Sequence, residues 1–186
     1  MSAPLVKLIG LAGVAGAGKD AAAEHLWRCH GFHRYALAQP LRDMLSALMA
    51  GTGVDMRAWM VERSLKEQPI PGIDISYRVL AQTLGTEWGR ALDSELWLRI
   101  AAMRLGLPQR PRYPRIVITD VRFPGEAAWV QALGGQVWRL DRLQAEAVNP
   151  HISEQLIREI HADAAIDNSG SFAELYRQLD FQVGTL

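Results

Sequence analysis

Cysteine is almost absent from this sequence, and neither sign of charge is in excess. The 186 residues include one cysteine, Cys29, so no disulfide can form within the chain, which is consistent with a reducing compartment. We expect Cys29 to be a small core residue on a helix. The 20 basic residues balance the 20 acidic ones, so bulk charge does not indicate binding to nucleic acid or to a membrane surface. Any site for an anionic ligand must therefore be a local cluster.

Long hydrophobic runs are missing as well. No apolar run approaches the roughly 20 residues that span a bilayer, and residues 10–18 indicate a loop instead of a signal peptide. We therefore expect a cytoplasmic protein with no membrane partner. A hydrophobic fraction of 49% over 186 residues is enough for one domain with a sizeable core.

The most informative stretch is rich in glycine. Residues 13–20 (GVAGAGKD) fit the pattern G-x-x-x-x-G-K, follow an apolar run and precede a helical pattern. Glycines let the backbone curl so that its N–H groups point at phosphate oxygens, and the helix start adds further N–H groups. The predicted phosphate contacts are Gly13, Ala15, Gly16, Ala17, Gly18, Lys19, Asp20 and Ala21, with Lys19 reaching the outer phosphates. The alternative is a glycine-rich turn that binds no ligand.

Asp20 departs from the usual pattern, because Ser or Thr commonly binds Mg²⁺ at that position. A carboxylate is a hard oxygen ligand, so Asp20 could bind the ion directly. The alternative is an acidic residue that only stabilises the first turn of a helix.

Apolar runs and helical periodicity alternate along the rest of the chain. We expect strands over 5–11, 32–38, 115–120, 136–140 and 164–166, and helices over 21–30, 40–49, 54–65, 77–91, 95–105, 125–133, 153–160 and 172–180. This alternation predicts an α/β fold with a parallel sheet of about five strands and right-handed crossovers. Ligands of such sheets lie at the carboxyl ends of the strands.

The middle third of the chain is predicted to be helical throughout. We interpret residues 54–107 as an insertion over the sheet, within a single domain whose core comprises residues 1–53 and 108–186. Polar residues 141–153 indicate a mobile loop.

Asp120 ends the predicted strand 115–120, and an acid there together with a phosphate loop is the minimal apparatus for magnesium–nucleotide chemistry. It could bind Mg²⁺ through a water, orient an acceptor hydroxyl, or simply cap the next helix. Arginines are predicted around the strand ends at Arg78, Arg90, Arg122 and Arg142. Each alone is compatible with a solvated surface. As a set they favour a phosphorylated acceptor, because arginine binds phosphate oxygens in pairs.

Six short blocks span nearly the whole chain. They are residues 13–20 ending in GKD, 80–90 (LAQTLGTEWGR) with Trp97 shortly after, 118–126 (ITDVRFPGE), 134–142, 151–154 and 167–171. In this order they resemble the phage-type deoxynucleoside monophosphate kinases, within the P-loop nucleoside monophosphate kinases. The loop alone would be unspecific, whereas the Q-x-L-G-T-E and D-V-R-F-P blocks are much more specific.

The resemblance implies a three-layer P-loop kinase fold with a helical acceptor-binding insertion and a lid near residues 141–153. It implies transfer of the γ-phosphate of ATP to a deoxynucleoside monophosphate, with Mg²⁺ bound by Asp20 and Asp120. The implied catalytic residues are Lys19, Asp120 and Arg142, and the implied acceptor residues are Arg78, Gln82, Arg90, Arg122 and Trp97. For Trp97 we favour core packing over stacking on a base. Many relatives have Thr or Ser where Ala21 stands, so Asp20 would have to replace that hydroxyl.

Two other functions stay open from the sequence. Kinases of the same architecture act on dephospho-coenzyme A or on a hydroxyl of a modified base, and a non-catalytic nucleotide-binding module is conceivable, although Lys19 and Asp120 argue against it. The middle helices could support a homodimer. The Cys29-His30-x-x-His33 spacing resembles a metal site only superficially, because no second pair of ligands follows.

Overall fold

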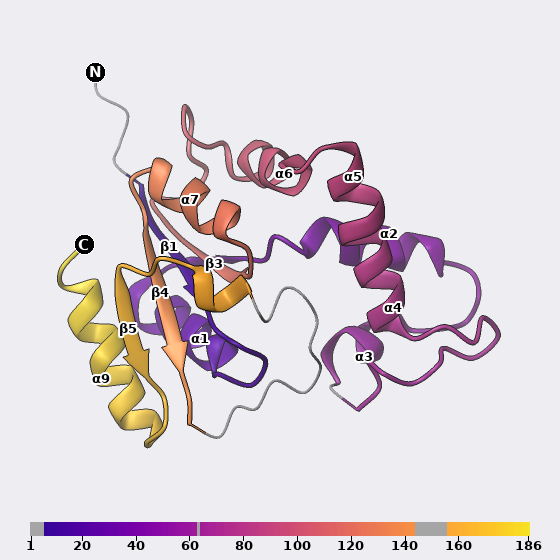
Figure 1. Cartoon of the computed structure of the whole chain (residues 1–186), viewed down its shortest axis with the longest axis horizontal. Coiled ribbons are helices and arrows are strands. Elements are labelled where there is room, and N and C mark those ends of the chain that lie inside the picture. The colour runs from indigo at the N-terminus through magenta and orange to yellow at the C-terminus, as the bar shows by residue number, and fades with distance from the viewer. Residues whose placement is uncertain (1–5, 63, 144–155) are drawn as a thin grey trace. The chain divides into compact units, whose positions relative to one another are not determined.

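The computed structural model describes residues 6–62, 64–143 and 156–186 (Figure 1). The chain forms two compact units: one comprises Met1–Leu37 and Ala102–Leu186, and the other comprises Ala38–Ala101.

The first unit contains a five-stranded sheet. Its strands are β1 (Lys7–Ala12), β2 (His33–Tyr35), β3 (Arg115–Val121), β4 (Gln136–Asp141) and β5 (Ala164–Asp167). They lie in the order β2-β3-β1-β4-β5, and every pairing is parallel. The predicted parallel sheet of about five strands is confirmed. The apolar runs located the strands, but β2 is shorter than the expected 32–38.

Helices cover both faces of this sheet, as the alternation of side chains along β1 requires. Ile9 and Leu11 share a core with α1 (Lys19–His30) and α9 (Phe172–Val183). Gly10 points to the opposite face, where a Cβ would lie 3.2 Å from a methyl group of Val130 in α7 (Pro124–Ala132). Figure 1 shows α7 and the pair α1 and α9 against the strands. The predicted three-layer α/β fold is confirmed.

The described residues of the second unit form helices and the loops between them, with no strand apart from an isolated bridge between Pro69 and Ser76. Its helices are α2 (Gln39–Leu48), α3 (Met56–Val61), α4 (Tyr77–Gln82), the π-helical stretch η1 (Thr83–Gly89), α5 (Arg90–Leu92) and α6 (Leu96–Leu105). The unit starts at residue 38 instead of the expected 54, because Leu45 of α2 and Met49, just after this helix, share a core with Met56, Ile70 and Tyr77. Its other boundary falls inside α6 instead of at residue 107.

Two local expectations differ from the structure. Of the helix predicted over 153–160, residues 153–155 lie outside the described residues, Leu156 is helical, and Ile157–Glu159 form a 3₁₀ turn, η2. Cys29 is exposed, not buried, because Leu26 is the last buried residue of α1 and the next turn faces solvent. Most of the expected lid, residues 144–153, lies outside the described residues.

Asn168, just after β5, anchors the glycine-rich loop that follows β1. Its side-chain amide donates to the carbonyl oxygen of Ala17 at 2.9 Å, and its main-chain N–H donates to the carbonyl oxygen of Asp141 at 2.7 Å. The residue is only 6% exposed. A Cβ at Gly18, whose φ is +97°, would collide with the Asn168 amide nitrogen. The loop therefore depends on a contact from 151 positions away in the sequence.

We expect Asn168→Ala to lower the free energy of unfolding by about 1–3 kcal/mol, because the buried Ala17 carbonyl loses its donor. Chemical denaturation followed by circular dichroism measures this. Ser169→Ala is the matched control: Ser169 is exposed and accepts the Leu143 N–H at 3.1 Å, where water can replace it, so a change under about 0.5 kcal/mol is expected. Equal effects at both positions would show that the buried amide does not stabilise the loop.

Candidate functional site

The segments predicted to bind phosphate and metal meet at one edge of the sheet in the first unit. Ala12, which ends β1, pairs with Val121 on one side and with Arg139 on the other. Asp141, which ends β4, pairs with Asp167, which ends β5. The carboxyl ends of parallel strands share an edge, so the glycine-rich loop is flanked by the residues after β3, β4 and β5.

The loop has the tight backbone that a phosphate site requires. Gly13 has φ +144°, and a Cβ there would lie 2.7 Å from the carbonyl oxygen of Leu140. Helix α1 begins directly after the loop, and its first internal hydrogen bond is donated by Ala22 N–H to the Gly18 carbonyl at 3.0 Å. The main-chain N–H groups of Lys19, Asp20 and Ala21 precede that bond at the positive end of the helix. This arrangement can bind an anion.

The side chain of Lys19 bends back over the loop. Its ammonium group donates to the carbonyl oxygens of Gly13 at 2.6 Å and Val14 at 2.9 Å. Both acceptors are main-chain atoms of the loop itself. The cation is thereby held at the loop where an anionic ligand would contact it.

Two carboxylates have the chemistry to bind Mg²⁺. Asp20 is exposed in the first turn of α1. Asp120 lies near the end of β3, where its Oδ1 accepts the Leu37 main-chain N–H at 2.7 Å, which fixes the carboxylate. Oxygen donors of this kind suit a hard cation, so both residues fit the group that the sequence predicted.

Arg122 follows β3 on a backbone held by the buried carboxylate of Glu126. Glu126 Oε2 accepts the main-chain N–H groups of Arg122 at 2.7 Å and Phe123 at 3.2 Å, at the start of α7. The Arg122 residue itself is exposed. The fixed backbone and exposed guanidinium are compatible with contact to a phosphate ligand.

A cavity of about 620 Å³ lies beside the loop. It is lined by Gly13, Val14, residues 139–143, Ile157, Asp167 and Ser169. Arg142, predicted to act from the lid, approaches the Gly16 carbonyl at 3.5 Å, which is a weak contact. Arg139 instead binds Asp141 at 3.1 Å. Hydrogen bonds from Ser169 lower the pKa of Asp167 below its ordinary value, so that wall of the cavity is anionic at neutral pH.

Asn168, Glu126 and Ser169 are the residues of this site that sequence analysis did not single out for a role. Each has a main-chain partner (Ala17, Arg122 or Leu143), and Ser169 also binds the Asp167 carboxylate. The Asp167–Ser171 block marked the region of Asn168, but only as part of a resemblance. The contact with Ala17 has no local signal in the sequence.

Three predicted acceptor residues lie on the helix α4–η1–α5 of the second unit. Arg78 is half-buried and forms an ion pair with Glu67. Gln82 ends α4 and Arg90 begins α5, and both are half-buried. The carboxylate beside Arg78 means that an anion would have to share or displace this pair.

Trp97 is packed inside the second unit and is only 6% exposed. Its indole N–H donates to the carbonyl oxygen of Gly85 at 2.9 Å, an acceptor within the π-helical stretch. A Cβ at Gly89 would collide with the indole ring. Trp97 therefore has the core packing that we favoured, and contact with a base stays a prediction.

Comparison with solved structures agrees with the fold. Shikimate kinase from Aquifex aeolicus vf5 superposes with a TM-score of 0.55 at 13% identity, covering 96% of each chain. The protein TT1252 from Thermus thermophilus superposes with a TM-score of 0.51 at 18% identity, covering 97% of this chain and 98% of its own. At such identities the likeness shows a shared fold and nothing about substrate.

Sequence comparison identifies the family. A protein of Acanthamoeba polyphaga mimivirus, provisionally named a deoxynucleotide monophosphate kinase, is 28% identical over 188 residues, covering 92% of this chain and 93% of its own. The deoxynucleotide monophosphate kinase of Escherichia phage RB69 is 30% identical over 106 residues, 56% of this chain and 43% of the phage protein. The family model for deoxynucleotide monophosphate kinase matches residues 65–179. Because this match covers more than half of the chain, the protein belongs to the deoxynucleotide monophosphate kinase family.

Proposed function

We propose that this chain transfers the γ-phosphoryl group of ATP to a deoxynucleoside monophosphate and releases the diphosphate. The observation that carries the proposal is the loop after β1, where Lys19 is held over main-chain carbonyls at the start of α1, in a chain of the deoxynucleotide monophosphate kinase family. Phosphoryl transfer needs little covalent chemistry from the protein, so positioning and charge stabilisation are the main tasks.

On the donor side, the loop N–H groups and Lys19 would bind the β- and γ-phosphates. The ammonium stabilises the charge that develops on the transferring group. Arg142 would add a second cation from the segment after β4. The cavity of about 620 Å³ beside Gly13 and Val14 is large enough for the nucleoside of ATP.

Magnesium, when bound, neutralises charge between the phosphates. Asp20 and Asp120 are the carboxylates of this chain that would hold it. The hydrogen bond from Leu37 orients Asp120 for this role or for orienting the acceptor. Asp20 would replace the hydroxyl ligand that Ala21 cannot supply.

On the acceptor side, we assign Arg122 to the phosphate of the monophosphate. Glu126 would act as a positioning residue, because it holds the Arg122 main chain. In the second unit, Arg78, Gln82 and Arg90 are proposed to contact the acceptor. We propose that Trp97 contributes by supporting the Gly85–Gly89 stretch, which lies between Gln82 and Arg90.

Several broader expectations stay proposals. We propose that the sheet core and the helical insertion work together as one domain and that residues near 141–153 form a lid. We also propose that the protein is cytoplasmic and forms a homodimer. None of the helices in the described ranges is both long and apolar enough to cross a membrane.

We expect the purified protein to release ADP from ATP only with deoxynucleoside monophosphates in a panel that also holds ribonucleoside monophosphates and dephospho-coenzyme A. Lys19→Met should abolish transfer while circular dichroism stays unchanged, because the cation at the phosphates is lost. Lys7→Met, which removes the same charge from the opposite end of β1, is the control and should stay active. Turnover with dephospho-coenzyme A would move the chain to another acceptor, and binding of ATP without turnover of any acceptor would make it a non-catalytic module.

Asp20→Ala should raise the Mg²⁺ concentration for half-maximal rate by about tenfold or more, since even a group behind a metal ligand contributes about 10–100-fold. Asp20→Ser should recover part of the loss by supplying a hydroxyl ligand. The measurement is a Mg²⁺ titration of the initial rate at saturating nucleotides. An unchanged titration in Asp20→Ala would leave Asp20 as an acid that only stabilises the helix start.

Arg122→Lys and Arg90→Lys should each raise KM for the monophosphate or lower kcat by about tenfold, while ATP affinity measured without acceptor stays the same. Lysine keeps the charge but loses the paired geometry of the guanidinium, which is worth roughly one strong hydrogen bond of about 1.5 kcal/mol. Calorimetry gives ATP binding and steady-state kinetics give the acceptor parameters. Weaker ATP binding with normal acceptor kinetics would assign these arginines to the donor side.

A further inference from the structure

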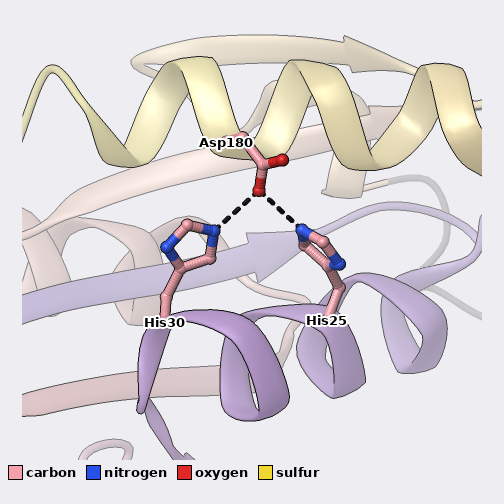
Figure 2. Close-up of side chains that lie close together, drawn as sticks. All are labelled: His25, His30 and Asp180. Atoms are coloured by element: carbon pink, nitrogen blue, oxygen red, sulfur yellow. Dashed lines mark hydrogen bonds and ion pairs between the residues drawn. The ribbon is translucent and has the colours of Figure 1, made fainter.

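Two histidines and one aspartate converge where α1 packs against α9 in the first unit (Figure 2). His25 Nε2 lies 2.6 Å and His30 Nε2 lies 2.7 Å from the same oxygen, Oδ1 of Asp180. One ligand atom from each residue lies within 4.8 Å of the other two. None of these residues belongs to the phosphate loop or to the cavity beside it.

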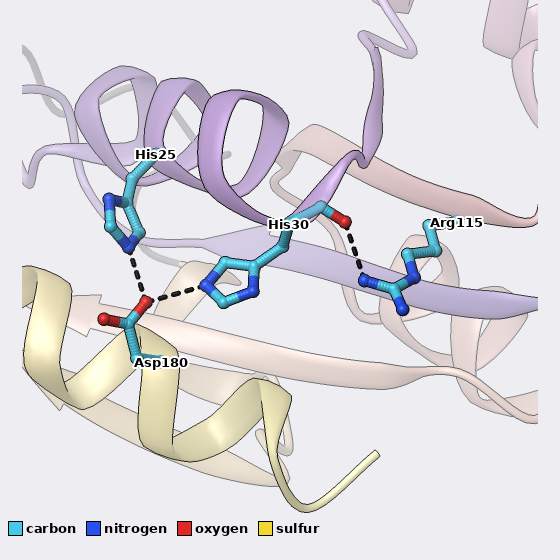
Figure 3. A network of polar contacts seen from close by, with 4 residues as sticks. All are labelled: His25, His30, Arg115 and Asp180. Atoms are coloured by element: carbon cyan, nitrogen blue, oxygen red, sulfur yellow. Dashed lines mark hydrogen bonds and ion pairs between the residues drawn. The ribbon is translucent and has the colours of Figure 1, made fainter.

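The cluster is held in place by its neighbours. The His25 ring stacks on Tyr176 with centroids 4.2 Å apart and planes 6° from parallel. His30 is the last residue of α1, and its carbonyl oxygen accepts a hydrogen bond from Arg115 at 2.8 Å (Figure 3). The stacking restrains the His25 ring and the hydrogen bond holds the main chain of His30, so little ordering would be needed for a ligand that binds between the two side chains.

The carboxylate of Asp180 interacts with the two histidines of this cluster. Within the described part of the chain, its ion-pair partners are the two imidazoles and no lysine or arginine. Hydrogen bonds from His25 and His30 hold the pKa of Asp180 below its ordinary value, so the carboxylate is ionised at neutral pH. An ionised carboxylate beside two imidazole rings, with no lysine or arginine paired to it in the described residues, offers a negative charge to a cation.

The ends of two helices add to this preference. His30 ends α1, and Asp180 lies three residues before the end of α9 at Val183. The C-terminal end of a helix carries partial negative charge and favours a cation. Imidazole nitrogen and carboxylate oxygen together are ligands for Zn²⁺ and its neighbours in the first transition row, not for Mg²⁺.

We propose that His25, His30 and Asp180 form a binding site for a divalent transition-metal ion of the zinc class, separate from the Mg²⁺ of phosphoryl transfer. The remaining coordination positions would be taken by water. Binding through Nε2 requires that nitrogen to lose its hydrogen, so each neutral imidazole would carry its proton on Nδ1 instead.

The geometry needs a small adjustment. Two ligand atoms about 2.1 Å from a tetrahedral ion lie about 3.4 Å apart, whereas the present N–O distances are 2.6 and 2.7 Å. The Asp180 carboxylate would therefore withdraw by less than about 1 Å to admit an ion with such bonds. Its side chain is 51% exposed, so a change of its rotamer meets little resistance.

The test is calorimetric titration of Zn²⁺ into chelator-treated full-length protein purified without a polyhistidine tag. We expect one ion per chain and a zinc-dependent rise in melting temperature, because binding to the folded state stabilises it. His25→Gln, His30→Gln and Asp180→Asn should each weaken zinc binding by at least about tenfold. Asp180→Asn preserves the size of the side chain and one acceptor oxygen, and the side chain is half exposed, so this variant should fold. It therefore tests the proposal even if a histidine variant fails to fold. Excess Mg²⁺ should not displace the zinc.

Two variants serve as controls. Cys29→Ser tests the exposed thiol that lies beside His30 in the sequence, and His161→Gln removes an exposed histidine outside the cluster. Both should bind zinc like the unmodified protein. The proposal is overturned if the unmodified protein takes up no zinc, if Asp180→Asn binds it with unchanged affinity, or if Cys29→Ser loses it.

Discussion

The buried hydrogen bond between the Asn168 amide and the Ala17 carbonyl is the contact on which the glycine-rich loop depends. When a loop points its N–H groups toward an anion, its carbonyl groups point away from that anion and into the protein. A carbonyl that is buried in this way needs a hydrogen-bond donor. Asn168 supplies that donor, and its own N–H ties the same point to Asp141 at the end of β4. One residue thus links the loop to two strands. The glycine at position 18 is required because Asn168 leaves no room for a side chain there.

Local charge is organised by main-chain contacts in a chain that is neutral as a whole. Lys19 is held by carbonyl oxygens, and the Arg122 backbone is held by a buried glutamate that does not pair with its guanidinium in the contacts described. Other arginines, such as Arg78 and Arg139, are instead paired with neighbouring carboxylates. In a chain with balanced acids and bases, main-chain contacts therefore help to place Lys19 and Arg122, whereas Arg78 and Arg139 are placed by ion pairs.

Helix α1 carries different chemistry at its two ends. Its start, at Lys19 and Asp20, offers N–H groups, a cation and a hard oxygen ligand, which suit phosphate and Mg²⁺. Its end, at His30, presents imidazoles beside the Asp180 carboxylate, which suit a softer cation. The helix dipole favours this order, with anions at the first turn and cations at the last. Packing of α1 against α9 brings Asp180 to these imidazoles.

The sequence by itself determined the sheet, the loop and the family resemblance, because these depend on local patterns. Apolar runs located all five strands, and the spacing of the glycines and Lys19 predicted a loop between the first strand and the first helix, where the structure has it. Only the tertiary structure assigned α2 to the second unit, because Leu45 and Met49 must find their core partners across loops. Only the tertiary structure brought Asn168 to Ala17 and Asp180 to His25 and His30. His25 and His30 are five residues apart, and five residues of a helix turn through about 500°, so the helix does not align their side chains as it aligns residues four apart. Their convergence depends on a carboxylate 155 positions from His25, and no local pattern encodes that distance.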